Sequence, residues 1–335
     1  MRQYLVRRLF GLVGVLLGIT LLTFIISHMI PADPAAAAAG QNASQETIEQ
    51  IRKEMGLDLP LYQQYLRYLS GLALHGDLGR SILNQRPVSK DIAIYLPASI
   101  ELALVSLLIS VPLSVFLGVI AGSRAGGVSD ALTRLGSVAG ASMPIFWLAL
   151  LMQLLFYKTL RWLPYGGRLG DGVNLPPHIT GLYIIDSLIS GQWQTLGSAL
   201  LHLILPALTL GLATGVAILR MTRSALLEVL HEDFIKTARA KGLAEKAVIY
   251  KHALRNALVP VVTIIGLQLG QLIAYVFLAE VIFSWPGIGS YAVRAIVAMD
   301  FNAIMGVTLV FSVVYVVINL IVDLSYPLID RRIRY

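Results

Sequence analysis

The sequence predicts an all-α protein that crosses a membrane several times, and three observations support this fold class. Hydrophobic residues make up 56% of the 335 residues and charged residues only 13%, whereas soluble domains carry about 25% charged residues. The apolar residues form runs of about twenty residues, long enough for a helix to cross the roughly 30 Å hydrocarbon core. The runs do not alternate as barrel strands do, and in lipid only helices or closed barrels satisfy the backbone.

Six apolar runs are the expected transmembrane helices, and the first is expected to remain as an anchor. They cover residues 9–30, 98–122, 134–160, 200–220, 258–283 and 304–328. The first run follows Arg7 and Arg8 and resembles a signal peptide at its start. It is longer than the apolar region of about 7–15 residues in such peptides, so we expect it not to be cleaved.

The distribution of basic residues predicts the orientation of the spans. With the N-terminus in the cytoplasm, the inner segments hold 16 lysines and arginines and the outer segments hold 10, although the outer segments are longer. Cytoplasmic segments carry the excess of lysine and arginine. Both termini are therefore expected to be cytoplasmic, and the basic residues follow topology rather than binding nucleic acid.

The spans divide the chain into three expected parts. Residues 1–30 are the cytoplasmic N-terminus and first span, residues 31–96 an external subdomain, and residues 97–335 the core transmembrane domain. The external part contains two amphipathic patterns, near 44–55 and 61–69, each typical of a short helix, with Ser44 as a helix cap. Its simplest interpretation is a plain connector, but connections of this length are uncommon without a role.

Acidic residues, prolines and glycines inside the spans are candidates for function or for helix packing. Glu101 and Glu280 lie near the outer ends of spans, where they would receive a substrate ammonium group or pair with polar neighbours. Prolines within spans, Pro112, Pro144 and Pro206, invite kinks. Glycines repeat at a spacing of four residues, as at 118/122 and 211/215, which favours close packing of helices.

The sequence contains no pattern typical of an enzyme. It has no cysteine, no phosphate-binding G-x-x-x-x-G-K-[ST], no H-E-x-x-H and no G-x-S-x-G, and its six histidines are scattered. Uphill transport would therefore draw energy from an ion gradient or from another chain. An ion-coupled carrier acting alone would show inverted repeats and acidic residues near the midplane, which the sequence does not display.

Residues 228–260 are the most informative segment. The surrounding stretch from Arg220 to Arg255 holds eight lysines and arginines, yet apolar runs lie on both sides of it. It predicts a short amphipathic helix between spans, either lying on anionic lipid or docking to a soluble protein. A purely scaffolding membrane protein would not need such a helix.

The residues of this segment resemble those of a known family. Glu232–Leu243, EDFIKTARAKGL, and His252–Leu258, HALRNAL, are similar to the ATPase-contacting loop of ATP-binding cassette importer permeases of the peptide/nickel subgroup. Further matches are Ile30–Pro34, Leu57–Tyr62, His75–Ser81, Arg220–Ser224, Phe283–Gly289 and Pro327–Arg334. The chain departs from the pattern at Ala32, where the family has glycine. Its Lys236-Thr237-Ala238 is the subgroup's form of the wider superfamily's Glu-Ala-Ala.

The resemblance implies the type I importer permease fold and a set of partners. The chain would sit in the bacterial cytoplasmic (inner) membrane and pair with a second, homologous permease. Two cytoplasmic ATPase subunits would bind ATP and Mg, so that this chain needs no cofactor, and an external substrate-binding protein would deliver substrate. Segment 163–181 is similar to members that carry dipeptides or oligopeptides, with nickel or glutathione as alternatives.

The resemblance also implies which residues couple this chain to the ATPases, within loop 221–257. The set is Glu232, Asp233, Thr237, Ala238, Arg239, Lys241 and Gly242. The two acids lie in the first turn, where the positive helix end favours them. The small residues are expected to leave one surface flat for a partner's groove, and the two basic residues are expected to pair with partner acids.

Overall fold

The structure is a computed structural model that describes residues 2–29, 34–40, 43–54 and 56–329. Every regular element in these ranges is a helix, apart from an isolated bridge between Arg80 and Pro87. The resemblance at Ile30–Pro34 and the basic tail after Ile329 therefore fall partly or wholly outside the described residues. The all-α class is confirmed. The chain divides into two units, Met1–Ala98 with Pro286–Val316, and Ser99–Trp285 with Val317–Arg334.

The first unit contains the external segment predicted at 31–96. Its helices are α1 (Arg2–Met29), α2 (Pro34–Ala39), α3 (Gln45–Glu54), α4 (Leu61–His75), the first turns of α5 (Val88–Ser123), α13 (Ile288–Val297) and most of α14 (Phe301–Ile329). The two predicted short helices are α3 and α4. The Thr47 amide donates to the hydroxyl of Ser44 at 3.2 Å, which confirms Ser44 as the cap of α3.

Two buried carboxylates hold the first unit together. Asp300 accepts hydrogen bonds from the Ser81 hydroxyl at 2.6 Å and the Leu83 amide at 3.0 Å. Asp91 accepts from the Asn84 amide group and the Tyr291 hydroxyl, both at 2.8 Å. Because both acids are fully buried, these bonds replace the water that each carboxylate loses on folding.

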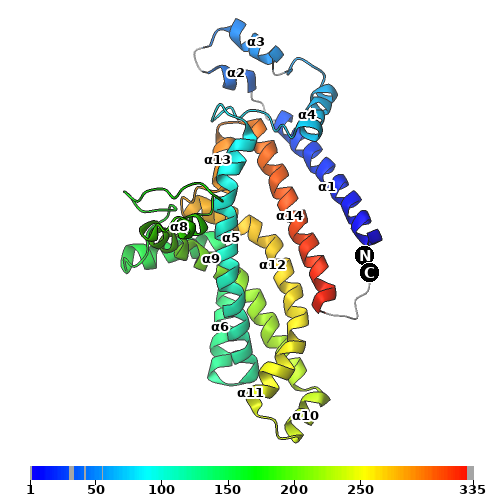
Figure 1. Ribbon diagram of the computed structural model, residues 1–335, viewed down its shortest axis with the longest axis vertical. Coiled ribbons are helices and arrows are strands. Elements are labelled where there is room, and N and C mark those ends of the chain that lie inside the picture. Colours follow the sequence, from blue (N-terminus) through cyan, green and yellow to red (C-terminus); the bar gives the residue numbers. More distant parts are fainter. Residues whose placement is uncertain (1, 30–33, 41–42, 55, 330–335) are drawn as a thin grey trace. The chain divides into compact units, whose positions relative to one another are not determined.

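The second unit carries the long helices and the polar segment 228–260 (Figure 1). Its helices are the rest of α5, α6 (Val128–Ser142), α7 (Ile145–Met152), the π-helix η1 (Gln153–Thr159), α8 (Tyr183–Ile189), α9 (Trp193–Leu230), α10 (Asp233–Ala240), α11 (Glu245–Ala247), the π-helix η2 (Val248–Ala253), α12 (Leu254–Ile282) and the end of α14.

Four helices are long and apolar enough to cross a membrane within the described ranges. They are Val88–Ser123, Trp193–Leu230, Glu245–Ile282 and Phe301–Val322. A fifth span results if the pair Val128–Ser142 and Ile145–Thr159 is counted as one. The apolar part of α1, Gly11–Ile26, is a shorter helix, so these residues account for five of the six expected spans by length and composition.

The span expected at 134–160 is not a single helix. It is broken between α6 and α7, whose axes differ by 110°. Met143 is extended, with φ −89° and ψ 122°, and Pro144 is the extended residue before α7. Proline restricts the preceding residue to extended backbone and lacks an amide hydrogen, so the predicted kink is here a complete break. Pro206, by contrast, lies inside the continuous helix α9.

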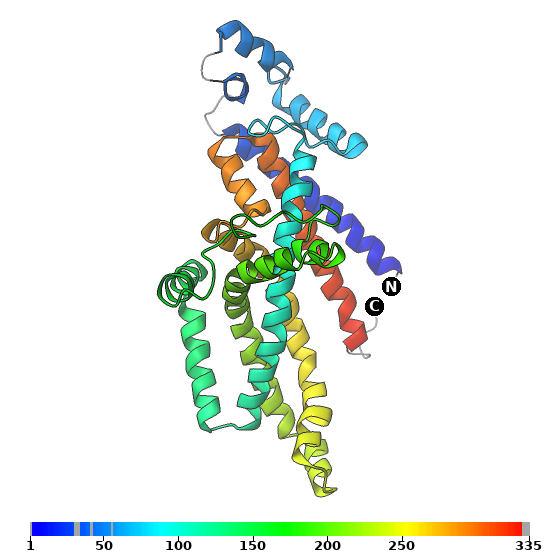
Figure 2. The ribbon, with the colours of Figure 1, turned by 60° about the vertical axis from the view of Figure 1, so that its left-hand side comes forward.

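Glycines allow α5 and α9 to approach closely in the second unit, as their spacing predicts. A Cβ added to Gly118 of α5 would lie 2.6 Å from the Thr222 Cβ and 2.9 Å from the Leu219 carbonyl oxygen of α9. A Cβ at Gly215 of α9 would lie 2.4 Å from the Ser114 hydroxyl of α5. The backbones of α5 and α9 therefore approach each other closely at these glycines. After a short loop, α6 runs beside the two helices (Figure 2).

Candidate functional site

The loop between α9 and α12 forms a short helix, α10, at the end of the second unit remote from α8 (Figure 1). Glu232 precedes the helix in extended backbone, and Asp233 lies in its first turn. The helix ends because Gly242 takes a φ of +74°, and its amide bonds the Arg239 carbonyl at 2.9 Å. Glycine adopts this left-handed conformation at little steric cost.

One face of α10 is buried against the chain's own helices. Ile235 is fully buried and Ala238 is 8% exposed. Both belong to a hydrophobic cluster with Leu226 of α9, Val248 of η2 and Ala257 of α12. Burial of this face packs α10 against the ends of both long helices, α9 and α12.

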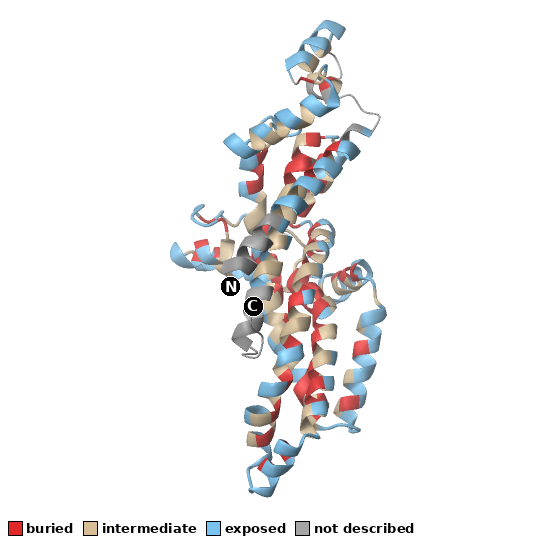
Figure 3. Ribbon diagram, turned by 90° about the vertical axis from the view of Figure 1, so that its right-hand side faces the viewer, coloured by how far each residue is buried: buried red, intermediate tan, exposed pale blue. Residues whose placement is uncertain are grey.

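The opposite face of α10 is open to solvent, and Figure 3 shows that this end of the unit is largely exposed. Phe234 is 44% exposed, and Thr237, Lys241, Gly242 and Leu243 are exposed as well. The Thr237 hydroxyl donates to the Asp233 carbonyl at 3.0 Å, which leaves its methyl group on the surface. The exposed face therefore combines apolar, polar and basic side chains.

Arg239 is held inside the loop rather than left free. Its guanidinium donates two hydrogen bonds to Glu245, at 2.7 and 3.2 Å, and this bonding raises the pKa of Arg239 above its ordinary value. The pair is half exposed, so it contributes at most about 1 kcal/mol. Lys241 has no carboxylate partner among the described residues, so its ammonium group is available to another chain.

The structure brings six of the seven predicted coupling residues onto the exposed surface of one segment. Glu232, Asp233, Thr237, Arg239, Lys241 and Gly242 are exposed. Ala238 lies on the inner face instead, so its small size serves the packing of α10 against this chain's own core. The sequence does not separate these two roles, because a small residue suits a buried face and a docking face equally.

A salt bridge ties the first turn of α6 to α9 near the same end of the unit. The guanidinium of Arg223 donates to the carboxylate of Asp130, with one bond of 3.0 Å. Asp130 also accepts from the Gly126 amide at 3.0 Å and contacts Arg134 at 3.2 Å. This network joins α9, which leads into α10, to α6.

Glu101 lies at the other end of the second unit, in a buried ion pair with Arg168. Their exposed fractions are 4% and 7%, and two guanidinium nitrogens of Arg168 lie 2.5 and 3.1 Å from one carboxylate oxygen. The other oxygen accepts from the Ile184 amide at 2.8 Å. The carboxylate is therefore fully engaged, and the interpretation that Glu101 pairs with a polar neighbour is the one that the geometry favours.

Arg168 also holds the segment 160–182 in place. It donates to the Gly181 carbonyl at 2.8 Å. Its guanidinium lies 3.6 Å from the centre of the Tyr183 ring and 5.8 Å from that of Trp285, both within cation–π range. The role of Arg168 was not predicted from the sequence, although a charged residue directly after Gly166 and Gly167 was a usable signal.

Asp186 organises the end of the same segment. Its carboxylate accepts hydrogen bonds from the Thr180 amide at 2.8 Å, the Thr180 hydroxyl at 2.7 Å and the Gly181 amide at 2.9 Å. Burial alone would raise the pKa of Asp186, but these hydrogen bonds outweigh burial and hold its pKa below the ordinary value. The carboxylate is thus charged at neutral pH and fixes the turn.

Glu280 of α12 is also buried, with no exposed surface. The Ser99 hydroxyl of α5 donates to its carboxylate. Neither Glu101 nor Glu280 therefore presents an open carboxylate to a substrate in this conformation. Across the residues that the structure describes, no group of three histidines, aspartates or glutamates has the geometry of a metal site.

Comparison with known proteins identifies the family. Residues 114–335 match the family described as "Binding-protein-dependent transport system inner membrane component", and residues 1–103 match its N-terminal companion. The probable D,D-dipeptide transport system permease protein of Escherichia coli is 46% identical over 98% of this chain and 96% of its own length. The dipeptide transport system permease protein of Alkalihalophilus pseudofirmus is 44% identical over all of both chains.

A further relative is named for a different substrate. The glutathione transport system permease protein of Escherichia coli is 37% identical over the full length of both chains. These relatives are transport permeases and not enzymes, and with the apolar helices they identify a multi-pass protein of the bacterial inner membrane. The chain belongs to the family of binding-protein-dependent transport system inner membrane components.

Proposed function

We propose that this chain is the permease subunit of an ATP-driven importer for dipeptides or oligopeptides and forms half of its translocation pathway. The relatives that share 41–46% of its residues over the full chain are named as dipeptide permeases. The glutathione permease is less similar, at 37%, so glutathione is the second candidate. A nickel complex is the third, supported only by the resemblance of the coupling loop to the subgroup as a whole.

The single observation that carries the coupling mechanism is that α10 is buried on one face and exposed on the other. Its inner face is anchored by Ile235 and Ala238 to the ends of α9 and α12. Its outer face presents Phe234, Thr237 and Lys241. A helix that is rigidly attached to two spans and open on the other side can transmit the movement of a bound motor subunit. ATP hydrolysis would occur in that subunit, which would hold ATP and Mg.

The remaining partners follow from the family and from the layout of the chain. A second, homologous permease would complete the pathway, and a substrate-binding protein would dock on the external segment 31–96. Both termini and loop 221–257 would face the cytoplasm, as the basic residues indicate. Glu101 and Glu280 would act on the pathway by fixing its wall, because their carboxylates already bind protein groups.

The coupling role can be tested on the assembled transporter in proteoliposomes. Gly242→Trp places a large side chain on the docking surface, and Gly126→Trp is the matched control. Both glycines have left-handed backbone, with φ of +74° and +78°, and neither has an atom within 4 Å of an added Cβ, so the backbone strain is the same. We expect Gly242→Trp to abolish ATP-driven uptake of a dipeptide and the control to retain it.

A second variant separates docking from folding. Thr237→Arg changes only an exposed side chain, so the protein should keep its melting temperature while losing substrate-stimulated ATPase activity. Full uptake by both Thr237→Arg and Gly242→Trp would contradict the coupling role. Uptake by this chain alone, driven by a proton gradient without ATP, would establish the competing class, an ion-coupled carrier.

The substrate class is tested with the partner binding protein. Its affinity for dipeptides and oligopeptides should exceed its affinity for glutathione and for nickel complexes in calorimetric titrations. A preference for glutathione or nickel would overturn the peptide assignment but leave the coupling role of α10 untouched.

A further inference from the structure

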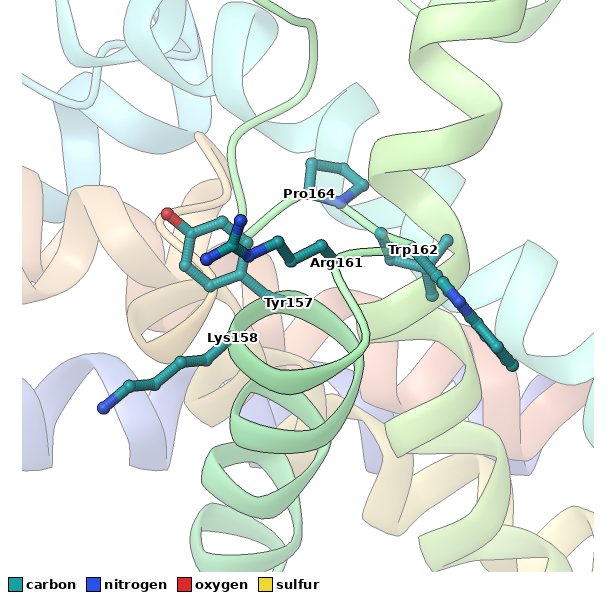
Figure 4. Close-up of a pocket in the computed structure, with 6 residues that line it drawn as sticks. Tyr157, Lys158, Arg161, Trp162 and Pro164 are labelled. Atoms are coloured by element: carbon teal, nitrogen blue, oxygen red, sulfur yellow. The ribbon is translucent and has the colours of Figure 1, made fainter.

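The turn that follows η1 contains a pocket of about 590 Å³ lined by basic and aromatic side chains (Figure 4). The lining residues are Tyr157, Lys158, Arg161, Trp162, Leu163 and Pro164. Figure 4 shows Lys158 and Arg161 extending on the same side of the turn, and the Trp162 ring on the other. None of these residues takes part in the coupling surface or in the Glu101–Arg168 network.

The pocket is held by defined contacts rather than by a loose loop. The Trp162 amide donates to the Phe156 carbonyl at 2.9 Å, and Arg161 turns the chain with a φ of +55°. The Tyr157 and Tyr165 rings meet edge to face with centres 5.5 Å apart. Below the turn, the buried Gln153 side chain donates to the carbonyls of Tyr165 and Ile282 at 3.1 and 3.2 Å.

The two basic side chains of the pocket lack an acidic partner. Both are exposed, and among the described residues neither Lys158 nor Arg161 forms a salt bridge or hydrogen bond through its charged group. Two positive charges without a counter-charge in one concave turn suit an anion, and a guanidinium next to an ammonium group is a frequent combination for phosphate.

An exposed apolar track leads along the helix to these charges. Trp147, Leu150 and Leu154 are each about half exposed, and their spacing of three and four residues places them on one side of α7 and η1. Lys158 follows within η1, four residues after Leu154, so the charged end of the pocket adjoins the apolar track.

We propose that this surface is a binding site for an anionic phospholipid, whose phosphate lies between Lys158 and Arg161 and whose acyl chain lies along Trp147, Leu150 and Leu154. The charges lie next to the apolar track, so one lipid can contact both, the charges with its phosphate and the track with an acyl chain. Tyr and Trp rings at the same level are typical of the membrane–water interface. A soluble phosphate would use the charges but not the track.

The test uses the complete transporter, purified in mild detergent, and native mass spectrometry of bound lipid. Phosphatidylglycerol and phosphatidylcholine with the same acyl chains are the two probes, and excess inorganic phosphate is the competitor. Near a membrane surface each basic residue contributes about 1 kcal/mol to anionic lipid binding. The double variant Lys158→Gln/Arg161→Gln should therefore weaken the tightest phosphatidylglycerol site roughly 30-fold, with no change for phosphatidylcholine.

Three controls make the result specific. Lys53→Gln/Lys90→Gln removes two exposed charges from the first unit and should leave lipid retention unchanged. Lys158→Arg/Arg161→Lys keeps both charges and should restore binding. Leu154→Gln should weaken the long-chain lipid but not a short-chain, water-soluble phosphatidylglycerol.

Several outcomes would overturn the lipid site. Equal phosphatidylglycerol retention by the wild type and the Lys158→Gln/Arg161→Gln variant is one. Displacement of the lipid by inorganic phosphate would assign the charges to a soluble anion. Crosslinking of Lys158 to the second permease, with lipid retention unchanged by the charge-removing variant, would show that protein covers this surface.

Discussion

Replacing Arg168 by methionine is expected to destabilise the second unit by several kcal/mol. Glu101 is 4% exposed and its carboxylate receives two of the guanidinium hydrogen bonds. Removing one partner of a buried ion pair leaves an uncompensated charge, which costs about 3–5 kcal/mol. The lost hydrogen bond to the Gly181 carbonyl adds roughly 1 kcal/mol. These contributions overlap, so we expect a total loss of about 3–5 kcal/mol.

The assay is thermal unfolding of the purified protein in detergent, together with limited proteolysis of the segment 160–182. At roughly 2 °C per kcal/mol, Arg168→Met should melt about 6–10 °C below the wild type, and the segment should be cleaved faster. Arg124→Met is the matched control, because Arg124 is exposed and its side chain has no partner in the described structure.

A double-mutant cycle tests the physical cause. Glu101→Gln keeps an acceptor for the Ile184 amide but removes the negative charge. This single variant therefore leaves the buried guanidinium of Arg168 without a counter-charge. In the Glu101→Gln/Arg168→Met variant no charge remains at this site. Its loss of unfolding free energy should be smaller than the sum of the two single-variant losses by at least about 2 kcal/mol. Additive losses, or an Arg168→Met variant as stable as the Arg124→Met control, would refute the reasoning.

Three further predictions follow from the packing and titration of individual residues. Gly118→Ala should lower the melting temperature, because its Cβ would lie 2.6 Å from Thr222, whereas Gly136→Ala has open space and should raise helix stability by up to about 1 kcal/mol. Ala238→Arg should lower membrane expression of the folded protein, since it places a charge in the cluster under α10. Asp186 has a folded pKa below its unfolded value of about 3.9, so its contribution to stability is present above that pH and lost as pH falls through the folded pKa. Proteolysis of the segment 160–182 should accelerate in that acid range, and Asp186→Asn should remove this pH dependence.

The sequence predicted the features that depend on composition and local spacing. The apolar runs predicted the spans, because a helix in lipid needs about twenty apolar residues whatever its neighbours are. Ser44 predicted the start of α3, and the glycines at 118/122 and 211/215 predicted close packing of helices. Helix capping and close packing each need only a particular residue at a particular position. The basic segment between spans likewise indicated a short amphipathic helix.

Other features depended on residues that are distant in the chain, and only the tertiary structure decided them. The sequence showed that Glu101 lies in a span, where burying its charge is energetically costly. It did not indicate that Arg168, 67 positions away, lies beside it. It placed Ala238 among small surface residues, whereas contacts with α9 and η2 make it part of the core. Pro144 predicted a kink, and the structure set its size at 110°.

The sequence by itself therefore determined that this chain is a helical membrane protein with an amphipathic segment between two spans, because span length and charge are local properties. The tertiary structure decided which face of that segment stays open, and which buried acids are already paired. Those outcomes depend on contacts between residues that are distant in the chain. Leu226 and Ala257 belong to the same cluster under α10, and Arg168 pairs with Glu101 of α5. No local sequence pattern encodes such contacts.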